Sequence, residues 1–214
     1  RKSGVGIAIE QSRGDRPLKI GAIGLGVGTI ACYAKPGDEI DFFEINPDVI
    51  RLARSHFSFL EDCPARPTII QGDARLSLEK MGRPREYDIM VLDAFSSDAI
   101  PVHLLTAEAV GLYGRHLKPG GVIAIHVSNR HLRLVPVVTT LARHGGFQYA
   151  KINSNGNGDW LDDAVWILLT KSENFLKDPQ VLLASSEPTG PDARKVHLWT
   201  DKYTNLLEIL RPIE

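Results

Sequence analysis

The chain has 214 residues, 43% of them hydrophobic and 24% charged, a composition typical of one generous globular domain. Its formal net charge of −1 gives no overall basic character and argues against a nucleic-acid partner. The two cysteines, Cys32 and Cys63, cannot form a disulfide framework and show no metal-ligand spacing. They indicate a reducing compartment, the cytoplasm, and no metal cofactor. No apolar run reaches the length needed to cross a membrane.

The N-terminal part of the chain is expected to hold two strands and a glycine-rich turn. Residues 4–10 predict a short strand, and 1–17 are interpreted as the remnant of an N-terminal strand or hairpin. Residues 18–23 predict a buried strand that runs into the turn GLGVG at 24–28 and then into an apolar segment suited to a helix. Glycines let a backbone turn sharply and approach a ligand closely, and a helix start presents free N–H groups. Alone, the motif is equally consistent with a tight turn that binds nothing.

Strands and helices alternate through the middle of the chain. Apolar periodicity and turn residues predict strands at 40–45, 66–74, 87–92 and 122–128, and helices at 46–57, 74–81, 106–117 and 131–144. Two further strands, 147–152 and 164–170, have no helix between them, which predicts an antiparallel finish. We therefore expect an α/β fold with a Rossmann-like, doubly wound, seven-stranded sheet whose last strand is antiparallel. Residues 172–200 are predicted to be irregular, and 201–211 to form a short amphipathic helix.

Acidic residues fall at or just after the ends of the predicted strands: Glu44, Asp73, Asp93 and, in the loop that follows, Asp98. In an open α/β sheet, ligands bind beyond the carboxyl ends of the strands. Glu44 lies twenty residues after Gly24, the spacing at which an acidic side chain accepts hydrogen bonds from ribose hydroxyls. The alternative for Glu44 is a solvated carboxylate at a strand end.

Asp73 is a candidate contact for the adenine of such a nucleotide ligand, and the glycine spacing indicates which class of nucleotide it is. Asp73 can accept a hydrogen bond from an adenine amino group, cap the helix that follows, or do both. The dinucleotide fingerprint requires a third glycine at position 29, which is Thr29 here, and the third glycine comes at Gly28 instead. This spacing and the terminal strand pair suit an adenosyl-sulfonium ligand better than NAD, because S-adenosylmethionine has no pyrophosphate.

Five segments together resemble the spermidine synthase-like family, which has the S-adenosylmethionine-dependent methyltransferase fold. They are GAIGLGVGT (21–29), DFFEINPDVIRLA (41–53), IIQGDAR (69–75), YDIMVLDAFSSDAIPVHLLTAEA (87–109) and LKPGGVIAIHVSN (117–129). The ending WTDKYTNLL (199–207) is also similar to the tail of that family. The resemblance implies transfer of an aminopropyl group from decarboxylated S-adenosylmethionine to a polyamine. It also implies a donor-binding catalytic domain over 18–171 and a C-terminal extension over 172–214.

The resemblance also implies roles for individual residues. The cofactor-binding residues it implies are Gly24, Gly26, Gly28, Glu44, Ile45, Asp73 and Ala74. Asp93 occupies the position of the family's catalytic aspartate, which holds the acceptor amine and takes its proton; the alternative is an aspartate that bonds its own loop backbone. Asp98 would make a second amine contact. His103 matches the family's I-P-x-H pattern and either contacts the substrate or packs at a helix start.

Two departures from the family pattern leave alternatives open. Characterised spermidine synthases carry an aspartate in the glycine loop, where this chain has Val27, and a D-x-x-D motif, where Asp93 and Asp98 are five residues apart. Two alternative functions therefore stay open. The chain is either a methyltransferase that uses ordinary S-adenosylmethionine, or a non-catalytic module that binds a polyamine or a nucleoside. The resemblance further implies a homodimer, and some bacterial members are fused to a membrane segment, which for this protein would lie outside the given chain.

Overall fold

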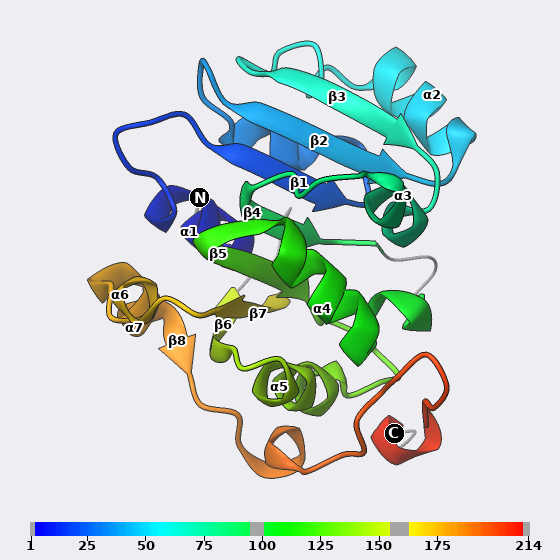
Figure 1. The fold of residues 1–214 in the computed structure, drawn as a ribbon, viewed down its shortest axis with the longest axis vertical. Coiled ribbons are helices and arrows are strands. Elements are labelled where there is room, and N and C mark those ends of the chain that lie inside the picture. The colour runs from blue at the N-terminus through cyan, green and yellow to red at the C-terminus, as the bar shows by residue number, and fades with distance from the viewer. Residues whose placement is uncertain (1–2, 95–100, 155–162, 212–214) are drawn as a thin grey trace.

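The computed structural model describes residues 3–94, 101–154 and 163–211, and one sheet occupies its centre (Figure 1). The strand order is β3-β2-β1-β4-β5-β7-β6-β8. Neighbours from β3 to β5 pair in parallel, whereas β7 is antiparallel to both β5 and β6. The strands are β1 (Lys19–Ile23), β2 (Glu39–Glu44), β3 (Arg66–Gln71), β4 (Tyr87–Leu92), β5 (Leu117–His126), β6 (Gln148–Ser154), β7 (Ala164–Thr170) and β8 (Ser185–Ser186).

Helices cover both faces of the sheet, so the predicted doubly wound α/β architecture is confirmed. Side chains of α3, α4 and α5 share one hydrophobic cluster with one face, and those of α1, α2, α6 and α7 share a second cluster with the other face. The α-helices are α1 (Gly4–Gln11), α2 (Pro47–His56), α3 (Ala74–Lys80), α4 (Ala107–His116), α5 (Leu134–His144), α6 (Glu173–Leu176) and α7 (Pro179–Ala184). The short 3-10 helices are η1 (Thr29–Tyr33), η2 (Val102–Leu104), η3 (Gly190–Ala193) and η4 (Leu207–Ile209).

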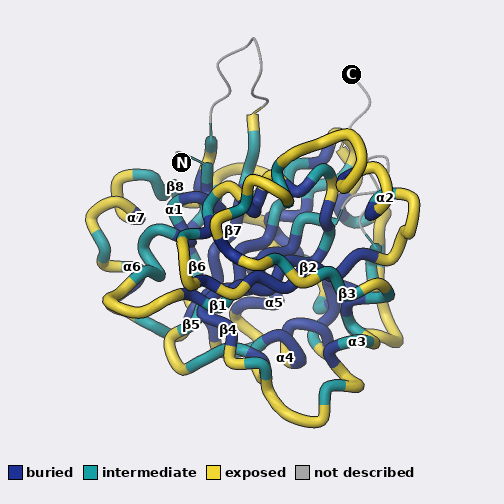
Figure 2. Tube along the Cα trace, turned by 90° about the horizontal axis from the view of Figure 1, so that it is seen from above, coloured by how far each residue is buried: buried dark blue, intermediate teal, exposed yellow. Residues whose placement is uncertain are grey.

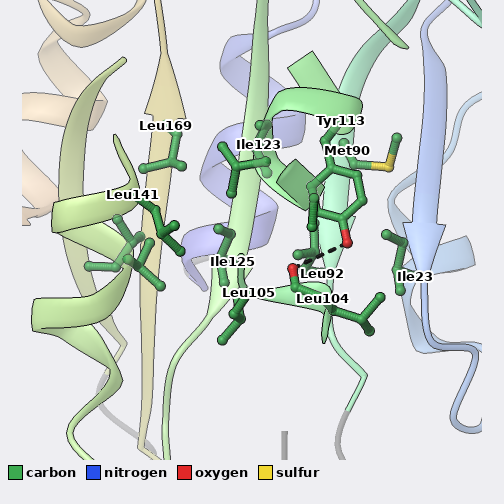
Figure 3. Packing of buried hydrophobic residues seen from close by; sticks show 14 of the residues in the cluster. Ile23, Met90, Leu92, Leu104, Leu105, Tyr113, Ile123, Ile125, Leu141 and Leu169 are labelled. Atoms are coloured by element: carbon green, nitrogen blue, oxygen red, sulfur yellow. Dashed lines mark hydrogen bonds between the residues drawn. The ribbon is translucent and has the colours of Figure 1, made fainter. Parts of the chain in front are cut away.

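The central strands alternate between the two clusters, as the period of a strand requires. In β4, every residue is buried; Met90 and Leu92 face α4 and α5, whereas Ile89 and Val91 face the opposite layer. Figure 2 shows the same strands as the buried centre of the molecule. In the cluster of Figure 3, Tyr113 of α4 packs over the sheet while its hydroxyl donates to the Leu104 carbonyl at 3.2 Å. A side chain that is buried in this way contributes roughly 2 kcal/mol relative to an exposed one.

The first segment is a helix, so the prediction of a strand over 4–10 is wrong. Ser3 caps α1 by accepting a hydrogen bond from the Gly6 N–H at 3.2 Å. The apolar residues that looked like a strand, Val5, Ala8 and Ile9, recur at helical spacing and are buried against the sheet. The small size of Gly4 permits this packing, because a Cβ there would lie 2.4 Å from the Trp166 Cβ.

The segment after the glycine turn is shorter than the helix predicted there. It forms the single 3-10 stretch η1 over Thr29–Tyr33. Pro36 disfavours helical geometry in the residue before it, and the Asp38 carboxylate accepts the Lys35 N–H at 2.7 Å to close the next turn. The chain therefore returns to the sheet at Glu39 without completing an α-helix.

The C-terminal part also differs from the prediction. Residues 172–200 were expected to be irregular but contain α6, α7, η3 and the two-residue strand β8, which makes the sheet eight-stranded. Residues 201–211 were expected to be helical but hold only the 3-10 turn η4 and bridges such as the one between Leu132 and Leu210. The backbone here follows contacts with distant elements, which override the local helical pattern.

Candidate functional site

The carboxyl ends of four parallel strands stand at one level. Ile23 of β1 is paired with Phe43 of β2 and with Leu92 of β4, and Leu92 is paired with Ile125 of β5. The pairing continues one residue further, because the Gly24 N–H donates to the Phe43 carbonyl and the Asp93 N–H donates to the Ile23 carbonyl, each at 2.9 Å. The next position along the strands is a single row across the sheet, in the order Glu44, Gly24, Asp93 and His126, which we call the terminal rung.

The terminal rung lies where the direction of chain winding changes. From β1 the chain passes to β2 and β3 on one side, and then crosses to β4 and β5 on the other. Ligands of doubly wound sheets bind at this switch point, beyond the carboxyl ends of the strands. The rung follows Ile23, Phe43, Leu92 and Ile125, which face the α3–α5 layer, so its side chains project from the opposite face.

The glycine turn begins on this rung and needs its glycines. Gly24, Gly26 and Gly28 have φ of 94°, 53° and 93°, in the left-handed region that other residues enter at a cost. At Gly24 the space is also closed, since a Cβ would lie 2.4 Å from the Asp93 carbonyl oxygen. At Gly26 a Cβ would meet no atom within 4 Å, so the backbone of the turn is open on that side. Val27 is half-buried in the same turn.

Glu44 is buried and holds the glycine turn in place. One carboxylate oxygen accepts the Leu25 N–H at 3.1 Å, and the other accepts the Asn46 N–H at 2.8 Å. Each carboxylate oxygen has two lone pairs, so each keeps one acceptor position beyond these bonds. The predicted place of Glu44 at a strand end is confirmed, and its carboxylate is buried rather than solvated. The next residue, Ile45, is 66% exposed, unusual for a large apolar side chain.

Asp73 lies beyond the end of β3 and has two partners. One oxygen accepts the Leu76 N–H at 2.8 Å and caps α3, as predicted, while the other lies 2.8 Å from Nε2 of His103. Burial would raise the pKa of Asp73, but the Leu76 N–H and the His103 ring hold it below its usual value. Ala74 is buried directly behind it, and His103 is half-exposed. The structure thus brings Asp73 and His103 together, a pair that the sequence did not indicate.

Asp93 forms a hydrogen-bonded chain that sequence reasoning missed. Its Oδ1 lies 2.8 Å from Nδ1 of His126, and Nε2 of His126 lies 2.9 Å from the Ser128 hydroxyl. That hydroxyl oxygen accepts the Val165 N–H at 2.7 Å, and the imidazole stacks on the Trp166 ring with centroids 4.7 Å apart. A signal existed in the sequence, since His126 lies near the end of the strand predicted over 122–128, the next strand after the one that ends before Asp93.

A second cluster lies beside Asp73, at the start of α3. Arg75 donates to the His103 carbonyl at 3.1 Å and to the Asp201 carboxylate at 2.6 Å, and Asp201 also accepts the Thr106 hydroxyl at 2.8 Å. The hydrogen bond from Arg75 lowers the pKa of Asp201 to about 2. The segment similar to the family's tail is therefore fastened next to the adenine side of the predicted site.

The predicted second amine contact, Asp98, lies outside the described residues. Within 3–94, 101–154 and 163–211, no group of three or more His, Cys, Asp or Glu side chains could hold a metal ion. Over the same ranges, no helix is long and apolar enough to cross a bilayer.

Comparison with curated proteins gives two informative relatives. A polyamine aminopropyltransferase of Vibrio vulnificus is 34% identical over 113 residues, which cover 50% of this chain and 37% of that protein. An N-terminal histidine N-methyltransferase of Emericella nidulans is 36% identical over 108 residues, 49% of this chain and 19% of that protein. The chain thus spans well under half the length of these relatives. No protein-family model matches it.

Comparison with solved structures identifies the fold. The spermidine synthase of Thermotoga maritima superposes with a TM-score of 0.60 at 16% identity, covering 94% of this chain and 67% of that one. A spermidine synthase in complex with the transition-state analogue AdoDATO gives a TM-score of 0.58 at 16% identity, over 94% and 66% of the two chains. The chain is therefore similar in sequence to a polyamine aminopropyltransferase over half of its length, and it shares the fold of the spermidine synthases.

Proposed function

We propose that the chain catalyses aminopropyl transfer from decarboxylated S-adenosylmethionine to a polyamine. The terminal rung is the observation that carries this proposal, because Glu44, Gly24 of the glycine turn and Asp93 follow one another along it, and Asp73 lies beyond the end of the neighbouring strand β3. Neighbouring strands lie about 4.8 Å apart, so the row from β3 to β4 extends over about 14 Å. A ligand that presents adenine, ribose and a sulfonium chain in that order fits such a row.

Each proposed role uses acceptor capacity that the fold leaves available. Asp73 would accept the adenine amino group, with Ile45 and Ala74 as apolar contacts beside the base. Glu44 would bind the ribose hydroxyls through its remaining lone pairs, while it continues to hold the glycine turn. The open side of Gly26 lets the turn approach the sulfonium side chain.

Asp93 would carry the chemical step at the acceptor. Its carboxylate is 34% exposed, so an ammonium group can reach it from solvent. A free amine resembles the lysine side chain, with a pKa of about 10.4, and is mostly protonated at neutral pH. Asp93 would hold this cation and take its proton, which frees the nitrogen lone pair to attack the alkyl carbon. The donor supplies an activated carbon–sulfur bond, which breaks as the nitrogen attacks and releases methylthioadenosine.

Methyl transfer from S-adenosylmethionine is the second candidate, and Val27 is the observation that favours it. An apolar side chain occupies the position where the family's aspartate helps to hold the amine of the aminopropyl donor. The similarity to the N-methyltransferase supports the same alternative. Both reactions would use the same terminal rung, and they differ in which carbon beside the sulfur the acceptor attacks.

The decisive experiment offers both donors and identifies the nucleoside product. Incubation with decarboxylated S-adenosylmethionine and a panel of polyamines should release methylthioadenosine. Release of S-adenosylhomocysteine alone, from S-adenosylmethionine, would replace the aminopropyl assignment with methyl transfer. Calorimetric binding of either donor with neither product would instead identify a binding module.

The setting of the reaction is part of the proposal. We propose a cytoplasmic location, which the two unpaired cysteines support, since Cys32 and Cys63 are free thiols. A homodimer and fusion to a membrane segment outside this chain stay predictions. Size-exclusion chromatography with light scattering tests the first directly.

A further inference from the structure

We propose that His126 is a positioning residue for the acceptor site: it fixes the Asp93 carboxylate so that one oxygen faces the incoming amine. This inference rests on the proposed function, because it assigns Asp93 to the acceptor. It concerns a residue that no family pattern quoted above singles out. The support is the hydrogen-bonded chain on the terminal rung, together with the packing of the imidazole.

The hydrogen-bond network assigns the protonation of the imidazole. Nδ1 of His126 lies 2.8 Å from a carboxylate oxygen, so Nδ1 must carry a proton, because a bare nitrogen lone pair would repel that oxygen. The Ser128 oxygen already accepts the Val165 N–H at 2.7 Å, and its own proton can be donated to Nε2 at 2.9 Å. A proton on Nδ1 thus lets the imidazole donate to Asp93 while Nε2 pairs with the Ser128 hydroxyl.

Packing also restrains the imidazole of His126. His126 of β5 is paired with Trp166 of β7, and the two rings stack with an interplanar angle of 12°. Trp166 is itself 4% exposed and packs closely against Gly4 of α1. The ring that donates to Asp93 is thus held by Asp93, Ser128 and Trp166, which limits its freedom to rotate.

The two oxygens of the Asp93 carboxylate therefore differ in their hydrogen bonds. Oδ1 accepts from His126, and no described residue makes a hydrogen bond to Oδ2. With Oδ1 held, the carboxylate plane is fixed, and Oδ2 is the oxygen that meets the acceptor amine. A fixed carboxylate avoids the loss of rotational freedom that a mobile one would undergo on binding the amine.

Two substitutions separate this role from packing. His126→Phe keeps a ring for stacking on Trp166 but cannot donate to Asp93. His126→Asn loses the stack but places an amide N–H near the position of Nδ1. We expect His126→Phe to lower kcat about tenfold or more, in line with one lost orienting hydrogen bond, while the Kd of the donor changes less than about twofold. His126→Asn should retain kcat within about threefold.

Other outcomes are equally decisive. Unchanged kcat in His126→Phe would overturn the proposal. Greater impairment of His126→Asn than of His126→Phe would also overturn it, because stacking would then matter more than donation. Long-range ¹⁵N–¹H spectra give a readout that does not need turnover: they should show His126 with its proton on Nδ1, whereas an Nε2–H tautomer contradicts the inference. Wild-type chain that releases no methylthioadenosine refutes the proposed function alone.

Discussion

Glu44 and Asp93 stand on the same rung but are bound very differently. Both oxygens of Glu44 accept backbone N–H groups, whereas Asp93 has one oxygen engaged by His126 and is 34% exposed. A buried carboxylate with both oxygens hydrogen-bonded to the backbone suits a permanent contact, and a partly exposed one suits a group that exchanges partners. The two acids should therefore respond in different ways to loss of charge.

Asp93→Asn should abolish transfer and spare donor binding. The asparagine oxygen can still accept from His126, so the local structure is kept, but the charge that holds an ammonium and the site that takes its proton are both lost. We expect kcat to fall about 10²-fold or more, with the Kd of the donor unchanged within about twofold. Steady-state kinetics and calorimetry measure the two effects. Equal losses in kcat and donor affinity would contradict the assignment of Asp93 to the acceptor.

Glu44→Gln should weaken donor binding through the glycine turn. Glutamine has one acceptor oxygen and its amide nitrogen only donates, so either the Leu25 or the Asn46 N–H loses its partner, at a cost of about 1–3 kcal/mol. The affinity for the donor should fall about tenfold or more in calorimetry. The exposed Glu61→Gln provides the matched control, which should bind like the wild type. Wild-type affinity in Glu44→Gln would remove Glu44 from the site.

At the scale of elements, the glycine turn and the strand ends form one unit. At Gly24 the Asp93 backbone lies too close to leave room for a Cβ atom, whereas a Cβ atom at Gly26 would point into open space. The turn leaves β1 at the switch point, and its close approach to the Asp93 backbone places the donor and acceptor sides of the predicted site next to each other.

The two glycines should therefore differ in their tolerance of a methyl group. Both have positive φ, which costs about 1 kcal/mol for alanine, but only Gly24→Ala adds a backbone collision at 2.4 Å. We expect Gly24→Ala to lower the free energy of unfolding by about 3 kcal/mol or more, and Gly26→Ala by about 1 kcal/mol. Urea denaturation followed by circular dichroism measures both. Equal losses would show that backbone strain alone governs this turn.

The sequence predicted the elements whose signals are local. The strand ends at Glu44, before Asp73 and before Asp93, follow from apolar runs that stop at polar residues. The helix α1 was misassigned because its close contact with Trp166 depends on a strand that comes more than 150 residues later. The contacts of Asp93 with His126 and of Arg75 with Asp201 were missed for the same reason, since they join elements that are distant in sequence.

At the scale of the whole molecule, the two ends of the central strands have different charge environments. The carboxyl ends carry the terminal rung. Toward the opposite end of β4, Asp88 accepts hydrogen bonds from the Lys19 N–H at 2.8 Å and from the Lys118 ammonium at 3.1 Å, and it forms an ion pair with Arg16. Burial would raise the pKa of Asp88, but these three partners lower it below its usual value. Asp88 thereby ties together β1, β4 and β5 at the end of β4 opposite the terminal rung.

The lowered pKa gives a stability that depends on pH. A carboxyl whose pKa is lower in the folded than in the unfolded chain stabilises the fold fully above the unfolded value of about 3.9 and loses that effect as the pH falls through the folded value. Asp88→Asn should therefore lower the urea midpoint at pH 7, and its deficit relative to wild type should shrink at pH 3. The exposed Asp62→Asn is the control and should follow the wild type at both pH values. A deficit that does not depend on pH would show that packing, not charge, is what Asp88 supplies.

The contact between Gly4 and Trp166 has a consequence for how change spreads through this protein. Gly4 also donates its N–H to the Ser154 hydroxyl at 3.1 Å, so the start of α1 is tied to β6 as well as to β7. A larger residue at position 4 would push the indole, and the indole carries the imidazole beside Asp93. An apolar substitution at position 4 of α1 would thus displace the proposed acceptor residue Asp93 through two side chains, without touching it directly.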